Sequence, residues 1–235
     1  MRHNNAARSA GVAVAAAATF ALAACGSGAT GSSGATATSS AVAPPVPAAK
    51  ALTAADLPSD WKLAAVPGKA FVPSAIGELE SSRGLTYEPA ACKAPDIAGQ
   101  SEVEQTATAS QRVEITVSNA VYSVALLPGD VDIRTFESAA TGQCAKVTLS
   151  NGTASAQRIT TKQPLPSGID VPGGFVLDAT TIPVSGGGQP AHGLAAYLTT
   201  HGTTVIVSSA VGASGTVDRV TFDDVLDRVV KKVSG

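Results

Sequence analysis

The chain has 235 residues, of which 44% are hydrophobic, 14% charged and only 4% aromatic, and its formal net charge is −2. Its only run of basic residues is the pair Lys231-Lys232. A protein that binds nucleic-acid phosphates should carry a basic stripe, so we expect no nucleic-acid partner.

The first 24 residues have the form of a secretory signal peptide. Arg2 and Arg8 make a short basic head, and an uncharged apolar run covers residues 11–22. A helix that crosses a bilayer needs about 20 apolar residues, whereas the apolar core of a signal peptide has about 7–15. We therefore expect residues 1–24 to direct export and to be removed.

The apolar run ends in Leu22-Ala23-Ala24-Cys25, which resembles the lipobox of bacterial lipoproteins. The resemblance implies cleavage between Ala24 and Cys25, a diacylglycerol on the Cys25 sulfur and an acyl group, such as palmitate, on its amino group. Each buried methylene contributes about 0.8 kcal/mol, so several acyl chains would anchor the protein stably at the outer face of the cytoplasmic membrane. The alternative is a freely secreted protein in which Cys25 has no role.

Residues 25–50 predict a disordered tether. Gly, Ser, Thr, Ala and Pro dominate the segment, and Lys50 is its only charge. Such a composition cannot bury enough surface to offset chain entropy, and a coil of about 25 residues reaches on the order of 25–30 Å. Gly26, Gly28 and Gly31 match a dinucleotide-binding fingerprint, but that motif needs a preceding strand and a following helix, so the match is by chance.

Residues 51–235 form the predicted single globular domain. Loss of residues 1–24 leaves 14 basic against 18 acidic residues, a net charge of about −4. The domain holds Cys92 and Cys144, and an even pair in an oxidising compartment indicates a disulfide. It would close a loop of about 50 residues and stabilise the fold by roughly 4 kcal/mol. Two buried free thiols and a reactive thiol pair are the alternatives.

The start of the domain predicts short elements. Thr53 can cap a helical turn that Pro58 stops, and Trp61 is expected to pin this segment to the core. Short extended pieces are expected over residues 71–88. Pro89 is a plausible first residue of a short helix that reaches position 92.

The middle and end of the domain predict mostly strands. Partial alternation of apolar and polar residues predicts strands at 113–117, 120–127, 147–149, 156–161, 175–184, 194–199 and 203–211. Asp132 can cap a helix that ends near residue 142, and His201-Gly202 predicts a hairpin turn. The clearest helix begins at Thr221, with Asp224 in capping-box position. The expected fold class is therefore α+β, an antiparallel sheet with flanking helices that include an amphipathic C-terminal helix.

Several of these segments resemble an actinobacterial, mycobacterial-type envelope family. They are "LTAADLPSDW", "YEPAACKAP" and "FESAATGQC", together with the long hairpin and the closing helix. The family includes the extracellular sensor domain of PknH-type Ser/Thr kinases and many small lipoproteins. The resemblance implies a sheet with flanking helices around a cleft that binds an unidentified ligand. The kinase sensors have more cysteines, and this chain has no kinase domain, so any sensing would require a separate partner.

Motifs of catalysis and metal binding are absent from the sequence. It lacks G-x-S-x-G, H-E-x-x-H, C-x-x-C and the P-loop pattern. His192 and His201 remain after export and could approach each other in a hairpin, but the sequence shows no orienting acid beside them. Asp223, Asp224 and Asp227 suit the solvated start of a helix better than acid–base work. We expect no enzyme activity, no metal and no cofactor.

The sequence therefore favours a lipid-anchored envelope lipoprotein that acts as a non-catalytic ligand-binding, sensory or interaction module. Its expected partners are the membrane, through Cys25, and an unidentified small envelope ligand or protein. A carrier of lipids or glycolipids is the first alternative, although the scarcity of aromatic residues argues mildly against a wide apolar cavity. An envelope hydrolase and a structural spacer are the others.

Overall fold

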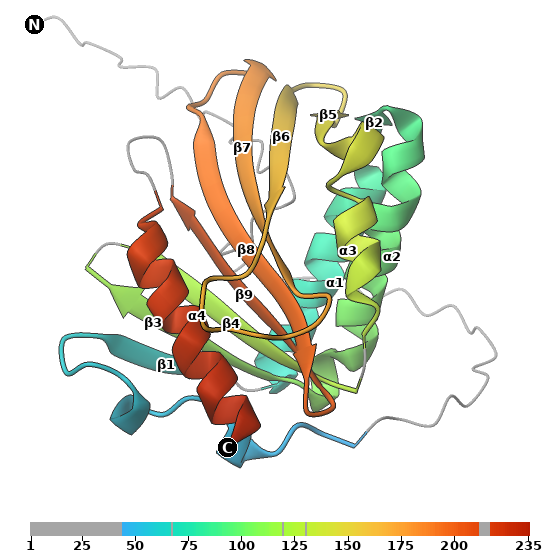
Figure 1. Ribbon diagram of the computed structural model, residues 1–235. Helices are drawn as coiled ribbons and strands as arrows, with labels where there is room; N and C mark the ends of the chain where they lie inside the picture. The colour runs from blue at the N-terminus through green and yellow to red at the C-terminus, as the bar shows by residue number, and fades with distance from the viewer. Residues whose placement is uncertain (1–43, 67, 119, 130, 212–216) are drawn as a thin grey trace, which may run out of the picture.

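The computed structural model describes residues 44–235 except 67, 119, 130 and 212–216, with the backbone alone described at 210 and 211. The predicted signal peptide, Cys25 and most of the predicted tether lie outside these residues. Within them, nine strands form one antiparallel sheet in the order β1-β3-β4-β9-β8-β7-β6-β5-β2 (Figure 1). The strands are β1 (Lys62–Val66), β2 (Thr86–Glu88), β3 (Gln111–Val117), β4 (Ala120–Pro128), β5 (Lys146–Ser150), β6 (Ser155–Gln163), β7 (Phe175–Ser185), β8 (Ala191–Thr200) and β9 (Thr203–Val211).

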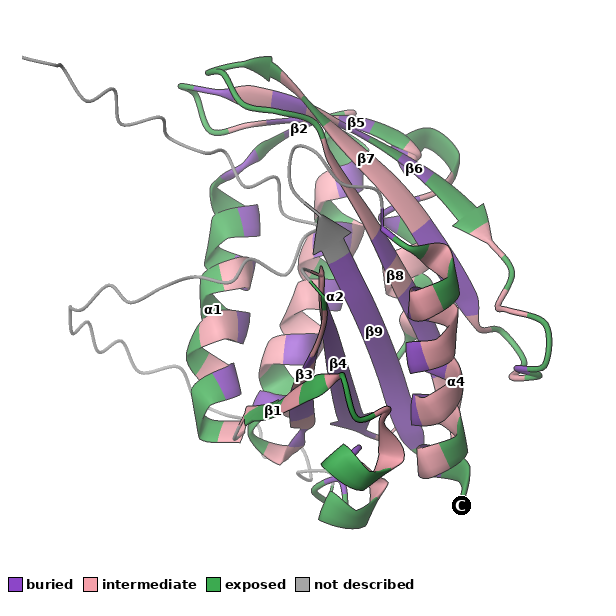
Figure 2. Cartoon of the chain, turned by 90° about the vertical axis from the view of Figure 1, so that its left-hand side faces the viewer, coloured by how far each residue is buried: buried purple, intermediate pink, exposed green. Residues whose placement is uncertain are grey.

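Helices cover both faces of this sheet. Helices α1 (Gly68–Gly84), α2 (Lys93–Thr106) and α3 (Ile133–Ser138) lie on one face, and α4 (Arg219–Ser234) lies on the other (Figures 1 and 2). Short 3-10 turns lie at Ala48–Lys50, Ala54–Asp56, Ala90–Cys92, Ala107–Ala109 and Gly142–Cys144. The predicted α+β fold, with its antiparallel sheet and its C-terminal helix, is confirmed.

The central strands are buried from both sides. Residues 122–128 of β4 and 203–209 of β9 are buried without interruption, and Figure 2 shows β9 between α4 and the other helices. A strand that is covered on both faces needs no polar side. This explains why the alternation of these strands in the sequence is only partial.

Helix α4 closes one of two main apolar cores. Phe222, Leu226 and Val229 are almost fully buried and pack against the sheet. Burial of one such side chain is worth roughly 1.5–3 kcal/mol. The helix begins at Arg219, two residues before the predicted start, because Asp218 accepts a hydrogen bond from the backbone N–H of Val220 and so caps it earlier. The predicted capping box from Thr221 to Asp224 is therefore wrong.

The prediction of extended pieces over residues 71–88 is also wrong. Residues 68–84 form α1, and only Thr86–Glu88 is a strand. Pro73 lies in the second helical turn, where the loss of its N–H removes one hydrogen bond. Phe71, Ala75 and Leu79 recur every four residues and are buried, so packing outweighs that loss.

Helix α2 extends well beyond the short helix predicted at Pro89. A 3-10 turn over Ala90–Cys92 leads into α2, which continues to Thr106. Its buried face carries only Asp96, Gly99 and Val103. With one large apolar residue among them, the face gives no recognisable helical period in the sequence.

The packed chain begins before residue 51, the predicted start of the domain. Val46 is 4% exposed and belongs to the α4-side core. Its backbone N–H donates to the carbonyl of Ala109 at 2.9 Å. Residues 53–56 then form the predicted capped turn, in which the backbone and hydroxyl of Thr53 both donate to Asp56 Oδ2 at 2.7 Å.

Candidate functional site

A groove lies on the face of the sheet that α1, α2 and α3 cover. About 110 Å³ of it is open to the centres of water-sized molecules, and the whole space between its atoms, open solvent included, is about 1050 Å³. Six strands, β3, β4, β9, β8, β7 and β6, supply its floor, whereas α2, α3 and the residues just after α3 supply its wall.

The strand register lines up small side chains along this floor. One cross-strand row joins Ser123, Ser208 and Ala195. The next row joins Gly193, Ala179 and Thr160, and a third joins Ala191, Thr181 and Arg158. Because side chains alternate between the two faces of a strand, these residues all face the same helices. Apart from Arg158, these side chains are small, and their small size leaves the depression.

A stack of three aromatic rings lies at one end of the groove, and two of them, Phe136 and Tyr197, line it. Phe136 of α3 stacks on Tyr197 of β8 with ring centroids 4.8 Å apart, and Tyr197 stacks in turn on Phe175. Gly99 of α2 lies against Phe136 so closely that a Cβ there would come within 2.9 Å of the ring. Glycine at this position therefore lets α2 and α3 approach each other and form one wall.

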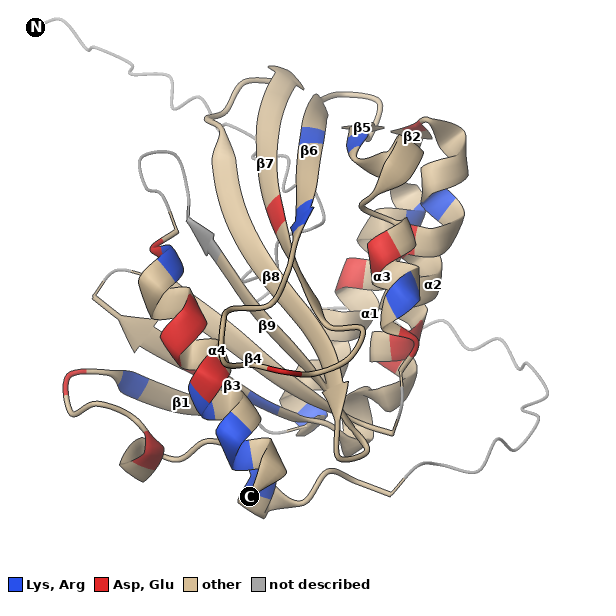
Figure 3. Ribbon diagram, viewed as in Figure 1, with Lys and Arg blue, Asp and Glu red and all other residues tan. Residues whose placement is uncertain are grey.

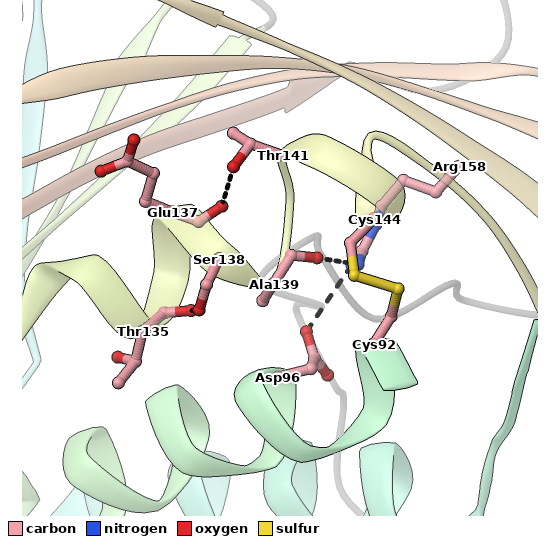
Figure 4. The surroundings of a disulfide bond; sticks show 9 residues. All are labelled: Cys92, Asp96, Thr135, Glu137, Ser138, Ala139, Thr141, Cys144 and Arg158. Atoms are coloured by element: carbon pink, nitrogen blue, oxygen red, sulfur yellow. Dashed lines mark hydrogen bonds and ion pairs between the residues drawn. A yellow bond between two sulfur atoms is a disulfide. The ribbon is translucent and has the colours of Figure 1, made fainter. Parts of the chain in front are cut away.

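A buried charged cluster lies at the opposite side of the groove. Arg158 of β6 lies 3.8 Å from Asp96 of α2 and donates to the carbonyl of Ala139 at 3.2 Å (Figure 4). The Tyr87 hydroxyl donates to the second oxygen of Asp96 at 2.6 Å. Burial, reinforced by the Asp96 carboxylate, raises the pKa of Tyr87 well above its ordinary value. Tyr87 therefore stays protonated as a donor at any physiological pH.

A second charged cluster lies at the β3 end of the floor. Arg112 is 3.5 Å from Glu114, and its guanidinium lies over the Phe71 ring at 5.1 Å from the centroid. Burial raises the pKa of the nearby Glu78 carboxyl, and the positive charge of Arg112 opposes part of that rise. Each arginine of the groove thus has an acidic partner close by.

The groove also gathers most of the buried polar side chains of the described residues. Those that line it are Asp96, Arg112, Ser123, Arg158, Thr160, Ser208 and Ser209. Thr160 is 6% exposed, and its hydroxyl has no hydrogen-bond partner among the described residues. Buried polar groups are destabilising unless they are hydrogen-bonded, and most of those among the described residues lie in this one depression.

The structure places a disulfide between Cys92 and Cys144, the pair predicted from the sequence. The two sulfur atoms are 2.05 Å apart. Cys92 precedes α2 and Cys144 follows α3 (Figure 4). The bond therefore joins the two elements that form the wall of the groove, and it lies beside Asp96 and Arg158.

His192 has the acidic neighbour that the sequence did not reveal. Its Nε2 lies 2.7 Å from Asp178 Oδ1 on β7. Asp178 also accepts from Gln163, whose side chain is bonded to Arg219 at the start of α4. His192 is two residues from Leu194 on β8, and Leu194 belongs to the α4-side core, so this network lies on the face opposite the groove.

The other candidate residues have structural roles. His201 occupies the β8–β9 turn with φ 49° and bonds Thr200. Asp223, Asp224 and Asp227 pair with Arg219, Arg228 and Lys231, one helical turn away in each case, and Figure 3 shows these charges interspersed along α4. Among residues 44–235 as described, no group of three or more potential metal ligands occurs, and none of the described helices is long and apolar enough to cross a membrane.

Comparisons with known proteins say little about this groove. No protein-family profile and no curated protein matches the chain. The crystal structure of an uncharacterised Mycobacterium smegmatis protein, the Rv0999 ortholog, is similar with a TM-score of 0.42 and 14% sequence identity, over 76% of this chain and 92% of that one. A similarity at this level carries no conclusion about function.

Proposed function

We propose that the protein is an exported lipoprotein, anchored through Cys25, whose groove binds a small molecule of the cell envelope without changing it chemically. The groove carries this proposal, because its wall and floor bring buried polar side chains together in a concave surface. The anchor rests on the lipobox-like Leu22-Ala23-Ala24-Cys25. Binding would occur at the membrane surface, where a bound state could be passed to a separate partner.

The lining residues favour binding over catalysis. General acid–base and nucleophilic catalysis need a nucleophile within reach of an oriented base. Neither described histidine lines the groove, and its two acids, Asp96 and Glu114, are each beside an arginine. Such paired groups are suited to hold a ligand in one orientation.

The membrane anchor is tested by Cys25→Ala in the full-length chain. The wild type should fractionate with membranes and carry the mass of a diacylglycerol, and the variant should appear in the soluble or culture fraction without that mass. A variant that stays in the membrane fraction would contradict the anchor.

The groove is tested by native mass spectrometry of full-length protein isolated gently from its own envelope. Ala179→Leu fills the centre of the floor, whereas Thr180→Leu changes the next residue of the same strand, which faces away from the groove. Wild type and Thr180→Leu should release a bound molecule that Ala179→Leu lacks. If all three proteins are empty, or if all three carry the same molecule, the groove is not the binding site.

A further inference from the structure

The charge of the groove limits what it can bind. Its charged lining residues are Asp96, Glu114, Arg112 and Arg158, which sum to zero. Each arginine is held by an acid within 4 Å, and Arg158 also by a backbone carbonyl. A charged ligand would have to compete with these existing pairs, since the described lining offers no surplus charge of either sign. The groove therefore suits an uncharged ligand.

The hydroxyl groups of the floor require a polar ligand. Ser123, Thr160 and Ser208 are each less than 9% exposed and face the groove. The Thr160 hydroxyl is buried without a partner in the described chain. An acyl chain laid over these hydroxyl groups would offer them no hydrogen bond, and a buried hydroxyl group without a partner is destabilising. A ligand with hydroxyl groups would satisfy them.

The rest of the floor suits the flat C–H faces of a polyhydroxylated ring. Ala179, Gly193 and Ala195 lie between the hydroxyl-bearing residues and present only methyl groups or backbone. Planar polar side chains of Asp96, Gln100 and the two arginines also line the groove. Such side chains offer paired donors and acceptors that match neighbouring hydroxyl groups.

The length of the floor favours more than one ring. From β4 to β6 the groove crosses five neighbouring strands, or four inter-strand spacings, which is about 19 Å at roughly 4.8 Å per spacing. We propose that the groove binds an uncharged oligosaccharide, laid across strands β4, β9, β8, β7 and β6. This proposal rests on the proposed function, since it names the ligand class of the same groove.

The experiment is ligand-observed NMR and calorimetry on the full-length protein in phospholipid nanodiscs, which avoids sugar-based detergents. The neutral probes are tetrasaccharides of glucose, mannose, galactose and arabinose. Tetragalacturonate is the charged probe of similar length, and palmitate is the apolar probe. At least one neutral tetrasaccharide should bind the wild type and Thr180→Leu and fail to bind Ala179→Leu. Ser208→Ala, which removes one hydroxyl group from the floor, should weaken binding about 3- to 10-fold.

The possible outcomes separate this proposal from the proposed function. Binding of tetragalacturonate or palmitate that Ala179→Leu abolishes, with no binding of any neutral probe, overturns the oligosaccharide and keeps the groove as a binding site. Binding of a neutral tetrasaccharide that is unchanged in both Ala179→Leu and Ser208→Ala also overturns it. If no probe binds and the native protein is empty, both proposals fail. A second plugging variant, Ala191→Leu, replaces Ala179→Leu if that protein does not fold.

Discussion

The disulfide between Cys92 and Cys144 gives the most quantitative prediction about stability. The two cysteines are 52 residues apart, and closing a loop of that length in the unfolded chain corresponds to about 4 kcal/mol. Single domains are stable by only about 5–15 kcal/mol. The double variant Cys92→Ala/Cys144→Ala should therefore lose a large part of its free energy of unfolding. Alanine is chosen because both sites are buried and a serine hydroxyl would lack a partner there.

Urea unfolding followed by the fluorescence of Trp61, the single tryptophan, measures this loss. The wild type treated with a reductant is the matched control, because it should lose the same free energy as the double variant. The reductant should leave the double variant unchanged. A difference below about 1 kcal/mol between the double variant and the oxidised wild type would refute the entropic argument. Thiol alkylation of the unfolded wild type without reductant should label neither Cys92 nor Cys144.

Three further predictions concern α4, its contact with the N-terminal turn, and the β8–β9 hairpin. Phe222→Ala should lower the free energy of unfolding by about 3–5 kcal/mol because Phe222 is fully buried. Val220 is 78% exposed, so the control variant Val220→Ala should change that free energy by less than about 0.5 kcal/mol. Urea unfolding measures both values. Hydrogen bonds from Thr53 and then from Lys232 lower the pKa of Asp56 from 3.8 to about 2. The wild type should therefore be more stable than Asp56→Ala above about pH 4, and this difference should vanish as the pH falls towards 2. A difference that persists unchanged at pH 2 would contradict this. His201 has φ 49°, so His201→Val should destabilise the protein by roughly 1–2 kcal/mol, whereas His201→Gly should not. Thermal unfolding measures both. Equal losses of stability in the two variants would point to a role for the imidazole itself.

The elements that could be predicted from the sequence are those that are specified by residues close together in the chain. The strands from β3 to β9 follow from alternation and turn residues, and His201-Gly202 supplies the positive φ angles that a two-residue hairpin needs. The apolar face of α4 is continuous in the sequence. Helices α1 and α2 could not be recognised, because Pro73 signals a break and the buried face of α2 consists of Asp96, Gly99 and Val103.

The groove depends on information that a single sequence does not display. Its floor arises from the register of six strands, which brings Ser123, Ser208 and Ala195 into one row although they are far apart in the chain. The pair of Asp96 and Arg158 likewise joins α2 to β6. Asp178 and His192 are diagonal neighbours on β7 and β8, and the spacing between them gives no sign of contact until the register is known.

The two faces of the sheet differ in a way that packing alone does not explain. On the α4 face, apolar side chains fill the space up to the helix. On the other face, Phe71, Phe175 and Tyr197 fill one end, while alanine, glycine, serine and threonine leave the rest open. Protein interiors are otherwise close-packed, and larger apolar residues on this floor would bury more surface.

If the groove binds a ligand as proposed, its open floor gives up stability that larger apolar residues would supply, and this leads to a final prediction. Ala179→Leu adds apolar surface in a depression with room for it, so its free energy of unfolding should equal or exceed that of the wild type by up to about 1 kcal/mol, while its ligand is lost. Thr180→Leu changes the α4 face of the sheet, so this variant should keep the ligand. Urea unfolding and native mass spectrometry of the same preparations measure both quantities. A large destabilisation of Ala179→Leu would mean that the floor is close-packed in solution, and the argument from the open groove would then be wrong.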